Sequence, residues 1–334
     1  MIDSVLTAGW ATSIGSLPHD DAAEAAAFVV RHHPELPAAP TLPRRSPMEG
    51  MIAQAAFGVR GVDVAPDGTL VVDPALLDPG AAVLGGVHGE PFVGLRRFLE
   101  AARGRTDPIK LQVTGPLTLG LALCQGGGPS DVAFEVAAAA VRTRVLAMVD
   151  AARAAVPDAP LVVFLDEPGL TACDRADFPL DLDDTIDLVS GALAVLEPVA
   201  ITGVHCCGPT DWRAVTLAGP AILSLPVDAG VEASAGALGA FLDRGGWIAW
   251  GAVPTSGPVG DDGDLLWRRL ASLWCDLVRA GCDPVRVRAQ SLVTPACGLG
   301  LHDVHQAGHI LEMTRRVAER AADQAIGARL SVGA

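Results

Sequence analysis

Short apolar runs alternate with longer amphipathic stretches from about residue 108 to the end of the chain. The apolar runs have the length of buried strands and lie at 109–114, 161–165, 199–204, 221–225, 247–251 and 285–293. The stretches that follow have the length and apolar spacing of helices and lie at 130–155, 183–196, 210–217, 232–244, 264–280 and 302–325. Repeated strand–helix units of this length predict a parallel sheet that is covered by helices.

The first third of the chain is less regular. Residues 9–14 read as a strand that runs into a turn, and residues 20–32 read as an alanine-rich helix. Residues 34–47 are too rich in proline for a regular helix, and 58–90 show no clear elements. We predict one domain, residues 1–334, with an irregular insertion at about 34–107. Six strand–helix units are clear, one more lies at the N-terminus, and one further unit can be accommodated in the irregular part. This count favours an α/β fold of the (β/α)8 barrel type. The alternative is a doubly wound open sheet, but no G-x-G-x-x-G follows any expected strand.

Composition excludes several classes of function. Half of the 334 residues are hydrophobic, which allows a large core, and the net charge is −15. Only one lysine is present, Lys110, so the chain has no basic stripe for nucleic acid or an acidic membrane surface. There is no signal-like N-terminus and no apolar run near the ~18 residues of a membrane span. We therefore expect a cytoplasmic protein whose seven cysteines are reduced thiols or metal ligands.

The candidate chemistry lies at the ends of expected strands. His205 and Cys207 are two residues apart after the run at 199–204, so in an extended chain both side chains leave the same face. Cys297 follows the run at 285–293. One histidine and two cysteines are the ligand number and type of a catalytic zinc site that keeps a position open. The simpler interpretation is a buried histidine beside two inert thiols. Ser16, Asp166 and Glu167 also follow strand ends, where barrel enzymes build their active sites.

Five segments resemble the catalytic domain of cobalamin-independent methionine synthase and the zinc methyltransferases related to uroporphyrinogen decarboxylase. They are I-G-S-L-P at 14–18, V-T-G-P-L-T at 113–118, D-E-P at 166–168, H-x-C at 205–207 and T-P-A-C-G at 294–298. They span nearly the whole chain in the order of the family, and the H-x-C with the distant C-G is the most specific of them. The Cys207-Gly208 pair is also similar to the H-x-C-G of methylcobamide:thiol methyltransferases.

The resemblance implies a set of roles. Zinc would be held by His205, Cys207 and Cys297, and the methyl acceptor would be a thiol such as homocysteine. Ser16 and Asp166 would lie by the amino-acid substrate, and so would Glu90, which matches the glutamate of an H-G-E segment.

Two features depart from the family. Methionine synthases supply a glutamate to the zinc after the sixth strand, where this chain has Pro226, and Asp228 two residues later is the candidate fourth ligand. No folate-binding N-terminal domain is present in these residues, so a partner corrinoid protein is expected as methyl donor beside a methyl-folate.

Two further residues are candidates for catalysis. Glu167, next to Asp166, would bind a substrate amine or orient a ligand, and the alternative is a strand-end turn in which a carboxylate caps a helix. His19 would act on the donor side, or it is a turn histidine without a role in the reaction.

We therefore expect a zinc-dependent methyltransferase that activates a small thiol as the thiolate and takes the methyl group from a methyl-corrinoid or methyl-folate. Thiol attack on another electrophile, such as an epoxide, is an alternative with the same metal chemistry. A metal-free decarboxylase that binds a polycarboxylate, and a zinc-binding barrel without catalysis, stay open too. Homodimer formation is compatible with the sequence, but nothing in it identifies an interface.

Overall fold

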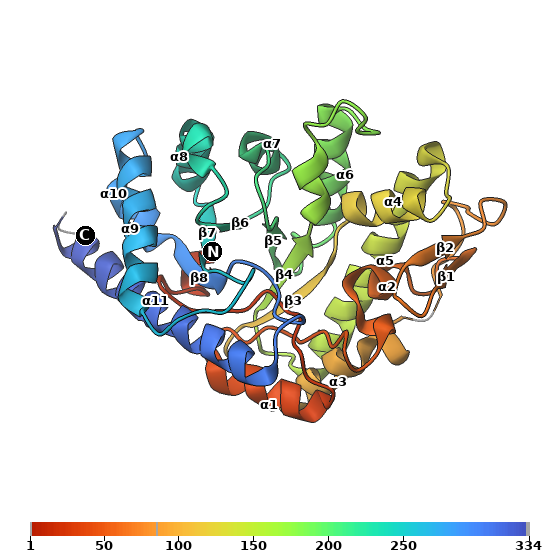
Figure 1. Ribbon diagram of the computed structural model, residues 1–334, viewed down its shortest axis with the longest axis horizontal. Helices are drawn as coiled ribbons and strands as arrows, with labels where there is room; N and C mark the ends of the chain where they lie inside the picture. Colours follow the sequence, from red (N-terminus) through yellow and green to blue (C-terminus); the bar gives the residue numbers. More distant parts are fainter. Residues whose placement is uncertain (1, 85, 332–334) are drawn as a thin grey trace.

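The sheet at the centre of the molecule has six parallel strands in sequence order. The structure, a computed structural model, describes residues 2–84 and 86–331. The strands are β3 (Ile109–Thr114), β4 (Leu161–Asp166), β5 (Ile201–His205), β6 (Ile222–Pro226), β7 (Trp247–Val253) and β8 (Ser291–Pro295). Figure 1 shows them side by side as a curled sheet. The predicted parallel α/β fold is confirmed.

Helices connect the strands and cover the convex side of the sheet. They are α4 (Pro116–Gln125), α5 (Ser130–Ala155), α6 (Leu182–Ala194), α7 (Trp212–Leu217), α8 (Ala235–Asp243), α9 (Gly263–Arg279), α10 (Pro284–Ala289) and α11 (Val304–Ser331). Short 3-10 turns, η4 (Pro168–Ala172) and η5 (Val231–Ser234), follow β4 and β6. In Figure 1, α6 to α9 fan out along one side, while α11 and the N-terminal helix α1 (Ala22–His32) lie along the other.

One predicted strand is wrong over most of its length. The run at 285–293 divides into helix α10 and strand β8. Asp283 accepts hydrogen bonds from the N–H groups of Val285 and Arg286, and Pro284 occupies the first helical position. An aspartate cap followed by proline is a helix-start signal, and it outweighs the β-propensity of the valines that follow.

The N-terminal part replaces two strands by irregular chain. Its elements are η1 (Ile2–Ser4), α1, η2 (Pro47–Glu49), α2 (Met51–Ala56), the antiparallel pair β1 (Val62–Val64) and β2 (Leu70–Val72), η3 (Glu90–Phe92) and α3 (Val93–Ala101). The predicted strand at 9–14 is absent as a regular strand. Single bridges instead join Ala11 to Val293, Ser16 to Thr41 and Ala38 to Lys110.

These bridges connect both edges of the sheet to the N-terminal chain without forming ladders. The structure therefore shows a six-stranded half-barrel among its described residues, and the expectation of eight regular strands is not confirmed. The segment that bridges β3 contains Pro37, Pro40 and Pro43. Prolines have no N–H to donate, so a continuous ladder cannot form there.

Side chains on the concave face of the sheet divide into two levels. Near the amino ends of the strands the face is apolar, and the cluster includes Val162, Phe164, Ile222, Trp247 and Leu292. The larger core cluster fills the space between the sheet and its helices. Asp166 and His205 are the last residues of β4 and β5, so these polar side chains lie at the carboxyl ends of the strands. No helix in the described part of the chain is long and apolar enough to cross a membrane.

Candidate functional site

The register of the parallel strands places Asp166 and His205, two of the predicted site residues, side by side in the sheet. Asp166 pairs with Thr114 of β3 on one side and with His205 of β5 on the other, and His205 pairs with Ser224 of β6. Paired residues of neighbouring parallel strands point to the same face of a sheet. The inward-facing residues Thr114, Asp166, His205 and Ser224 of β3 to β6 therefore lie side by side. This explains why residues far apart in sequence share one site.

The two cysteines that follow β5 and β8 meet beside this row. The thiols of Cys207 and Cys297 share a hydrogen bond, and Cys297 also interacts with the ring of His205. The shared hydrogen bond lowers the pKa of Cys207 and, together with burial, raises that of Cys297 to about 12. One thiol thus keeps its proton and donates it towards the other. Cys206 stands between His205 and Cys207 in the sequence, so its side chain is expected on the opposite face, and it is buried.

One ring nitrogen of His205 has a polar contact, and the other has no hydrogen-bond partner. Its Nδ1 lies 3.0 Å from the hydroxyl of Ser224, whereas its buried Nε2 has no hydrogen-bond partner. Metal-binding histidines commonly use the second ring nitrogen for such a contact, which fixes the ring orientation. A buried unpaired nitrogen next to two thiols is the donor chemistry that Zn²⁺ prefers.

As they stand, no three His, Cys, Asp or Glu side chains in the described residues are arranged to hold a metal ion together. The donor types and the unpaired Nε2 fit zinc, and binding would require the three side chains to move onto one ion.

A cavity of about 340 Å³, here called the inner cavity, opens beside the thiols. Five of the predicted site residues line it: Ser16, Asp166, His205, Cys207 and Cys297. Ser16 is held at the loop after β8, where its carbonyl accepts from Leu299 N at 2.9 Å or less and its hydroxyl lies 3.4 Å from Gly300 N. The N-terminal turn and the C-terminal strand therefore form one wall.

Asp166 is a buried carboxylate that lines the inner cavity. Its Oδ1 has no hydrogen-bond partner in the described structure, and burial raises its pKa to about 7 against the opposing effect of Lys110. The Lys110 ammonium is itself buried and donates to the carbonyl of Ile14 and the amide oxygen of Gln112. An unpaired carboxylate with a nearby cavity is suited to receive a cationic group of a ligand.

Glu167 points away from the inner cavity. It is fully buried and accepts hydrogen bonds from the N–H groups of Leu117 and Thr118 and from the Thr118 hydroxyl, at 2.6 to 2.9 Å. These groups form the first turn of α4, so the carboxylate caps that helix and interacts with its dipole. The structure thus favours the helix-capping interpretation of Glu167 over a catalytic one.

Three further predicted residues lie outside the inner cavity. His19 is buried against the ring of Phe28, with 4.6 Å between ring centroids. Glu90 is 56% exposed and forms an ion pair with Arg45 at 2.8 Å. Asp228 is exposed and lines a second cavity, which it shares with Cys207 and Cys297 but not with His205.

Several cavity residues were missed from the sequence. Glu49 and Gln54 belong to η2 and α2, which follow the proline-rich stretch, and no local signal distinguishes them. Glu49 is completely buried and accepts from Leu42 N and Gly94 N. Gln112 did carry a signal, because Lys110, Gln112 and Thr114 are alternate polar positions of an otherwise apolar strand.

Comparison with solved structures finds proteins of the same fold. The B12-independent methionine synthase from Shewanella sp. W3-18-1, in complex with selenomethionine, aligns with a TM-score of 0.64 over 96% of this chain and 99% of that chain. The putative vitamin-B12 independent methionine synthase from Listeria monocytogenes aligns with a TM-score of 0.58 over 90% and 85%. The chain shares their fold. Both are 14% identical to it in sequence.

Sequence comparisons gave no relative. No family model matches the chain, and no curated protein sequence matches it. The likeness to methionine synthases therefore rests on three-dimensional structure, and it agrees with the resemblance that the five sequence segments indicate.

Proposed function

We propose that the protein is a zinc-dependent methyltransferase whose acceptor is a small amino-acid thiol of the homocysteine type. The observation that carries the proposal is the meeting of Cys207, Cys297 and the unpaired Nε2 of His205 at one cavity wall. Two solved structures of the same fold are described as B12-independent methionine synthases, and one of them holds selenomethionine. The expected methyl donors are a methyl-corrinoid on a partner protein or a methyl-folate.

The three side chains would hold the zinc, and Asp228 is the candidate for a fourth ligand. Bound zinc would supply the Lewis acidity that keeps the acceptor thiol deprotonated at neutral pH, where a free thiol with a pKa near ~8.5 is mostly protonated. Ser224 would orient the histidine ring through its contact with Nδ1. The protein would thereby fix the sulfur in position for in-line attack on a methyl group.

The rest of the inner cavity would bind the amino-acid part of the acceptor. Asp166 would pair with the α-ammonium group, which favours the ionised carboxylate and satisfies its free oxygen. Ser16 and the loop that carries Gly298 and Gly300 would bind the α-carboxylate through hydroxyl and N–H groups. The apolar part of the lining, including Ile14 and Val113, would exclude water from the sulfur.

The alternative of a decarboxylase for polycarboxylates has less support. No arginine is among the described residues that line the inner cavity. Arg45 forms ion pairs with Glu49 and Glu90. Attack on an epoxide uses the same thiol machinery, and a comparison of donors in the assay below separates it from methyl transfer.

The decisive experiment is metal content by elemental analysis of protein purified without added metal. We expect near-stoichiometric zinc in the parent and a loss of zinc in Cys207→Ala and in Cys297→Ala. The matched control is Cys206→Ala, whose thiol is buried away from the site and whose loss is expected to leave zinc unchanged. Asp228→Asn tests the fourth ligand. Zinc below a tenth of an equivalent in the well-folded parent would sink the proposal.

Acceptor binding and turnover complete the test. Calorimetry with homocysteine should show an affinity that falls about tenfold or more in Asp166→Asn, because a charged hydrogen bond is lost. Methyl transfer to homocysteine is then measured with methylcobalamin and with methyltetrahydrofolate. Turnover with an epoxide but with neither methyl donor would favour the alternative alkylation.

A further inference from the structure

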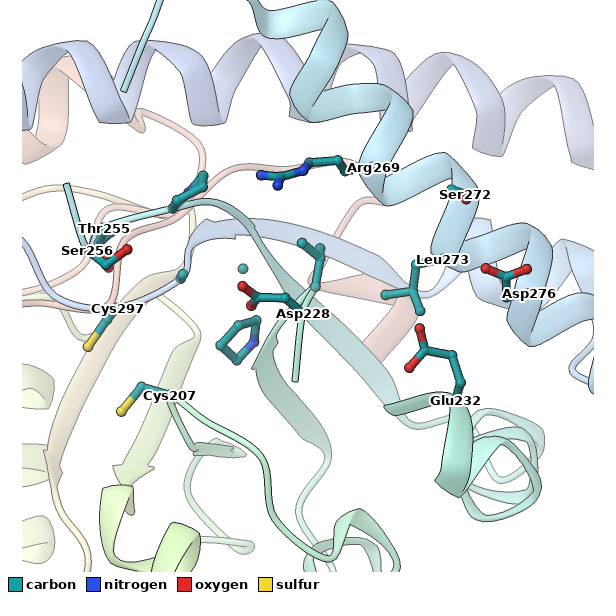
Figure 2. Close-up of a pocket in the computed structure, with 15 residues that line it drawn as sticks. Cys207, Asp228, Glu232, Thr255, Ser256, Arg269, Ser272, Leu273, Asp276 and Cys297 are labelled. Carbon is teal, nitrogen blue, oxygen red and sulfur yellow. The ribbon is translucent and has the colours of Figure 1, made fainter. Parts of the chain in front are cut away.

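A second cavity, here called the outer cavity, lies on the other side of the two thiols. It has a volume of about 430 Å³, and its wall is formed by the chain after β5, β6, β7 and β8 together with helix α9. Figure 2 shows Cys207 and Cys297 at one end of it, with Asp228 and Arg269 further in. The outer cavity has the size of a small-molecule site.

The thiols face both cavities. Cys207 and Cys297 line the inner cavity with Asp166, and they also line the outer cavity with Asp228. Molecules in the two cavities would therefore meet at the same pair of thiols. In-line transfer between two substrates requires such an arrangement, because the attacking sulfur and the leaving group must lie on opposite sides of the transferred carbon.

The outer cavity carries charges of both signs that have no partner within the protein. Asp228 and Glu232 are exposed carboxylates that form no ion pair in the described structure, and Arg269 of α9 forms none either. Asp276, by contrast, is paired with Arg279 at 2.5 Å. In Figure 2 the guanidinium of Arg269 and the carboxylate of Asp228 both extend into the cavity from different walls.

The remaining lining is suited to a small polar molecule with methyl groups. Pro226 and Leu273 are buried and provide apolar surface, while Thr255 and Ser256 provide hydroxyl groups. Pro226 stands at the end of β6, next to the carboxylate of Asp228. A ligand that complements these groups has a cationic, methylated centre near the carboxylates and a carboxylate near Arg269.

We propose that the outer cavity binds a small zwitterionic onium compound, a methylated sulfonium or ammonium that carries a carboxylate, as a further methyl donor for the thiol in the inner cavity. The proposal rests on the proposed function for its acceptor, but the binding of the onium compound does not depend on it.

The reaction balances without a further reactant. The acceptor thiol first releases its proton to solvent. Its sulfur then forms a bond to the methyl carbon while the bond from that carbon to the onium sulfur or nitrogen breaks. The bonding electron pair stays on the leaving atom, which becomes a neutral thioether or tertiary amine. No oxidant or reductant is consumed, and the charges of thiolate and onium cancel.

The first test is binding, measured by calorimetry with three probes. Dimethylsulfoniopropionate has both charges, and trimethylsulfonium has the cation alone. 4-Methylpentanoate has the shape of dimethylsulfoniopropionate and its carboxylate, with a neutral carbon in place of the sulfonium. The double variant D228N/E232Q should weaken binding of dimethylsulfoniopropionate and of trimethylsulfonium about threefold to tenfold, the range expected for two partly solvated charge pairs.

Matched controls separate a local effect from the general charge of −15. The double variant D158N/E197Q makes the same change at two exposed carboxylates outside the cavity and should leave affinity within about twofold. Arg269→Gln should weaken dimethylsulfoniopropionate but not trimethylsulfonium. Its control is Arg268→Gln, the neighbouring arginine, which lies near Asp262 at 3.9 Å.

The second test is transfer, followed by NMR with a ¹³C-labelled methyl group on dimethylsulfoniopropionate and with homocysteine as acceptor. We expect the label in methionine, and less of it with Glu232→Gln, which removes the outer-cavity carboxylate that is not a candidate zinc ligand, while zinc content stays unchanged. Equal weakening of binding in both double variants, or no transfer by protein that retains zinc and binds homocysteine, would overturn the onium proposal. Loss of zinc in Glu232→Gln would overturn it as well, since that carboxylate would then act through the metal. Onium binding by protein that holds no zinc would instead count against the proposed function alone.

Discussion

The sheet and the N-terminal chain build opposite walls of the inner cavity by different means. Strands β4 and β5 place Asp166 and His205 through backbone register alone. The N-terminal wall has no ladder, and side chains of β3 hold it instead. Lys110 donates to the carbonyl of Ile14, Gln112 to that of Ala39 and Thr114 to that of Met51, at 2.5 to 2.8 Å.

This difference shows how a half-barrel can enclose a site. Regular strands fix the reactive groups, and the three polar side chains of β3 bind backbone carbonyls of the irregular N-terminal chain and of the first residue of α2. Each buried bond of this kind replaces a ladder bond, so the proline-rich chain stays attached without regular structure. We expect substitution of Glu167, which points away from the inner cavity, to act mainly on stability, and substitution at the seam between the walls to act on binding as well.

The largest expected effect concerns Glu167 on the sheet side. Burial raises its pKa from the usual 4.5 to about 7, so the folded state binds a proton that the unfolded state has lost between these two values. The free energy of unfolding should therefore fall as pH rises from about 4.5 to 7, by up to about 3 kcal/mol from this residue. Denaturant unfolding between pH 5 and pH 8 measures the slope.

Glu167→Gln keeps the size of the side chain and removes the titration, so its slope should be clearly smaller than that of the parent. A residual slope is expected, because burial raises the pKa of Asp166 in the same range. Glu197→Gln, at an exposed position, is the control that should leave the slope unchanged. Identical slopes in the parent and Glu167→Gln would show that Glu167 is not buried as a cap.

A smaller effect is expected at the seam, where Gly298 of the β8 loop lies against Ser16. A methyl group at Gly298 would overlap the Ser16 hydroxyl, which must then turn away. We expect Gly298→Ala to cost about 1–2 kcal/mol in stability and to weaken homocysteine binding. Gly236→Ala in α8 has open space around it and serves as the control. Unchanged binding in Gly298→Ala would remove Ser16 from the acceptor site.

The smallest effect is expected at Glu90 in the N-terminal part. Its ion pair with Arg45 is partly solvated, so Glu90→Ala should change stability by less than about 1 kcal/mol and leave homocysteine affinity unchanged. The comparison is Glu49→Gln, which alters a buried carboxylate of the cavity wall and should impair binding. A marked loss of affinity in Glu90→Ala alone would mean that the N-terminal wall rearranges when the acceptor binds.

The sequence by itself determined the parallel α/β fold and the thiol site. The alternation of apolar and polar residues is a local property, so strands 109–114, 161–165 and 247–251 could be placed closely. The two-residue spacing of His205 and Cys207 gave their common direction for the same reason. Cys297 could be placed after a strand because it follows the apolar run at 285–293, although part of that run is helix α10.

Only the tertiary structure decided which carboxylates face the cavity. Asp166 and Glu167 are neighbours with similar chemistry, and the curvature of the sheet and the position of α4 determine that the first faces inward and the second caps the helix. Glu49 lines the cavity and Glu90 does not. The position of each is set by contacts between chain segments that are far apart in sequence. Such contacts leave no periodic trace in the sequence, and the outer cavity, formed by the chain after four separate strands and by α9, leaves none either.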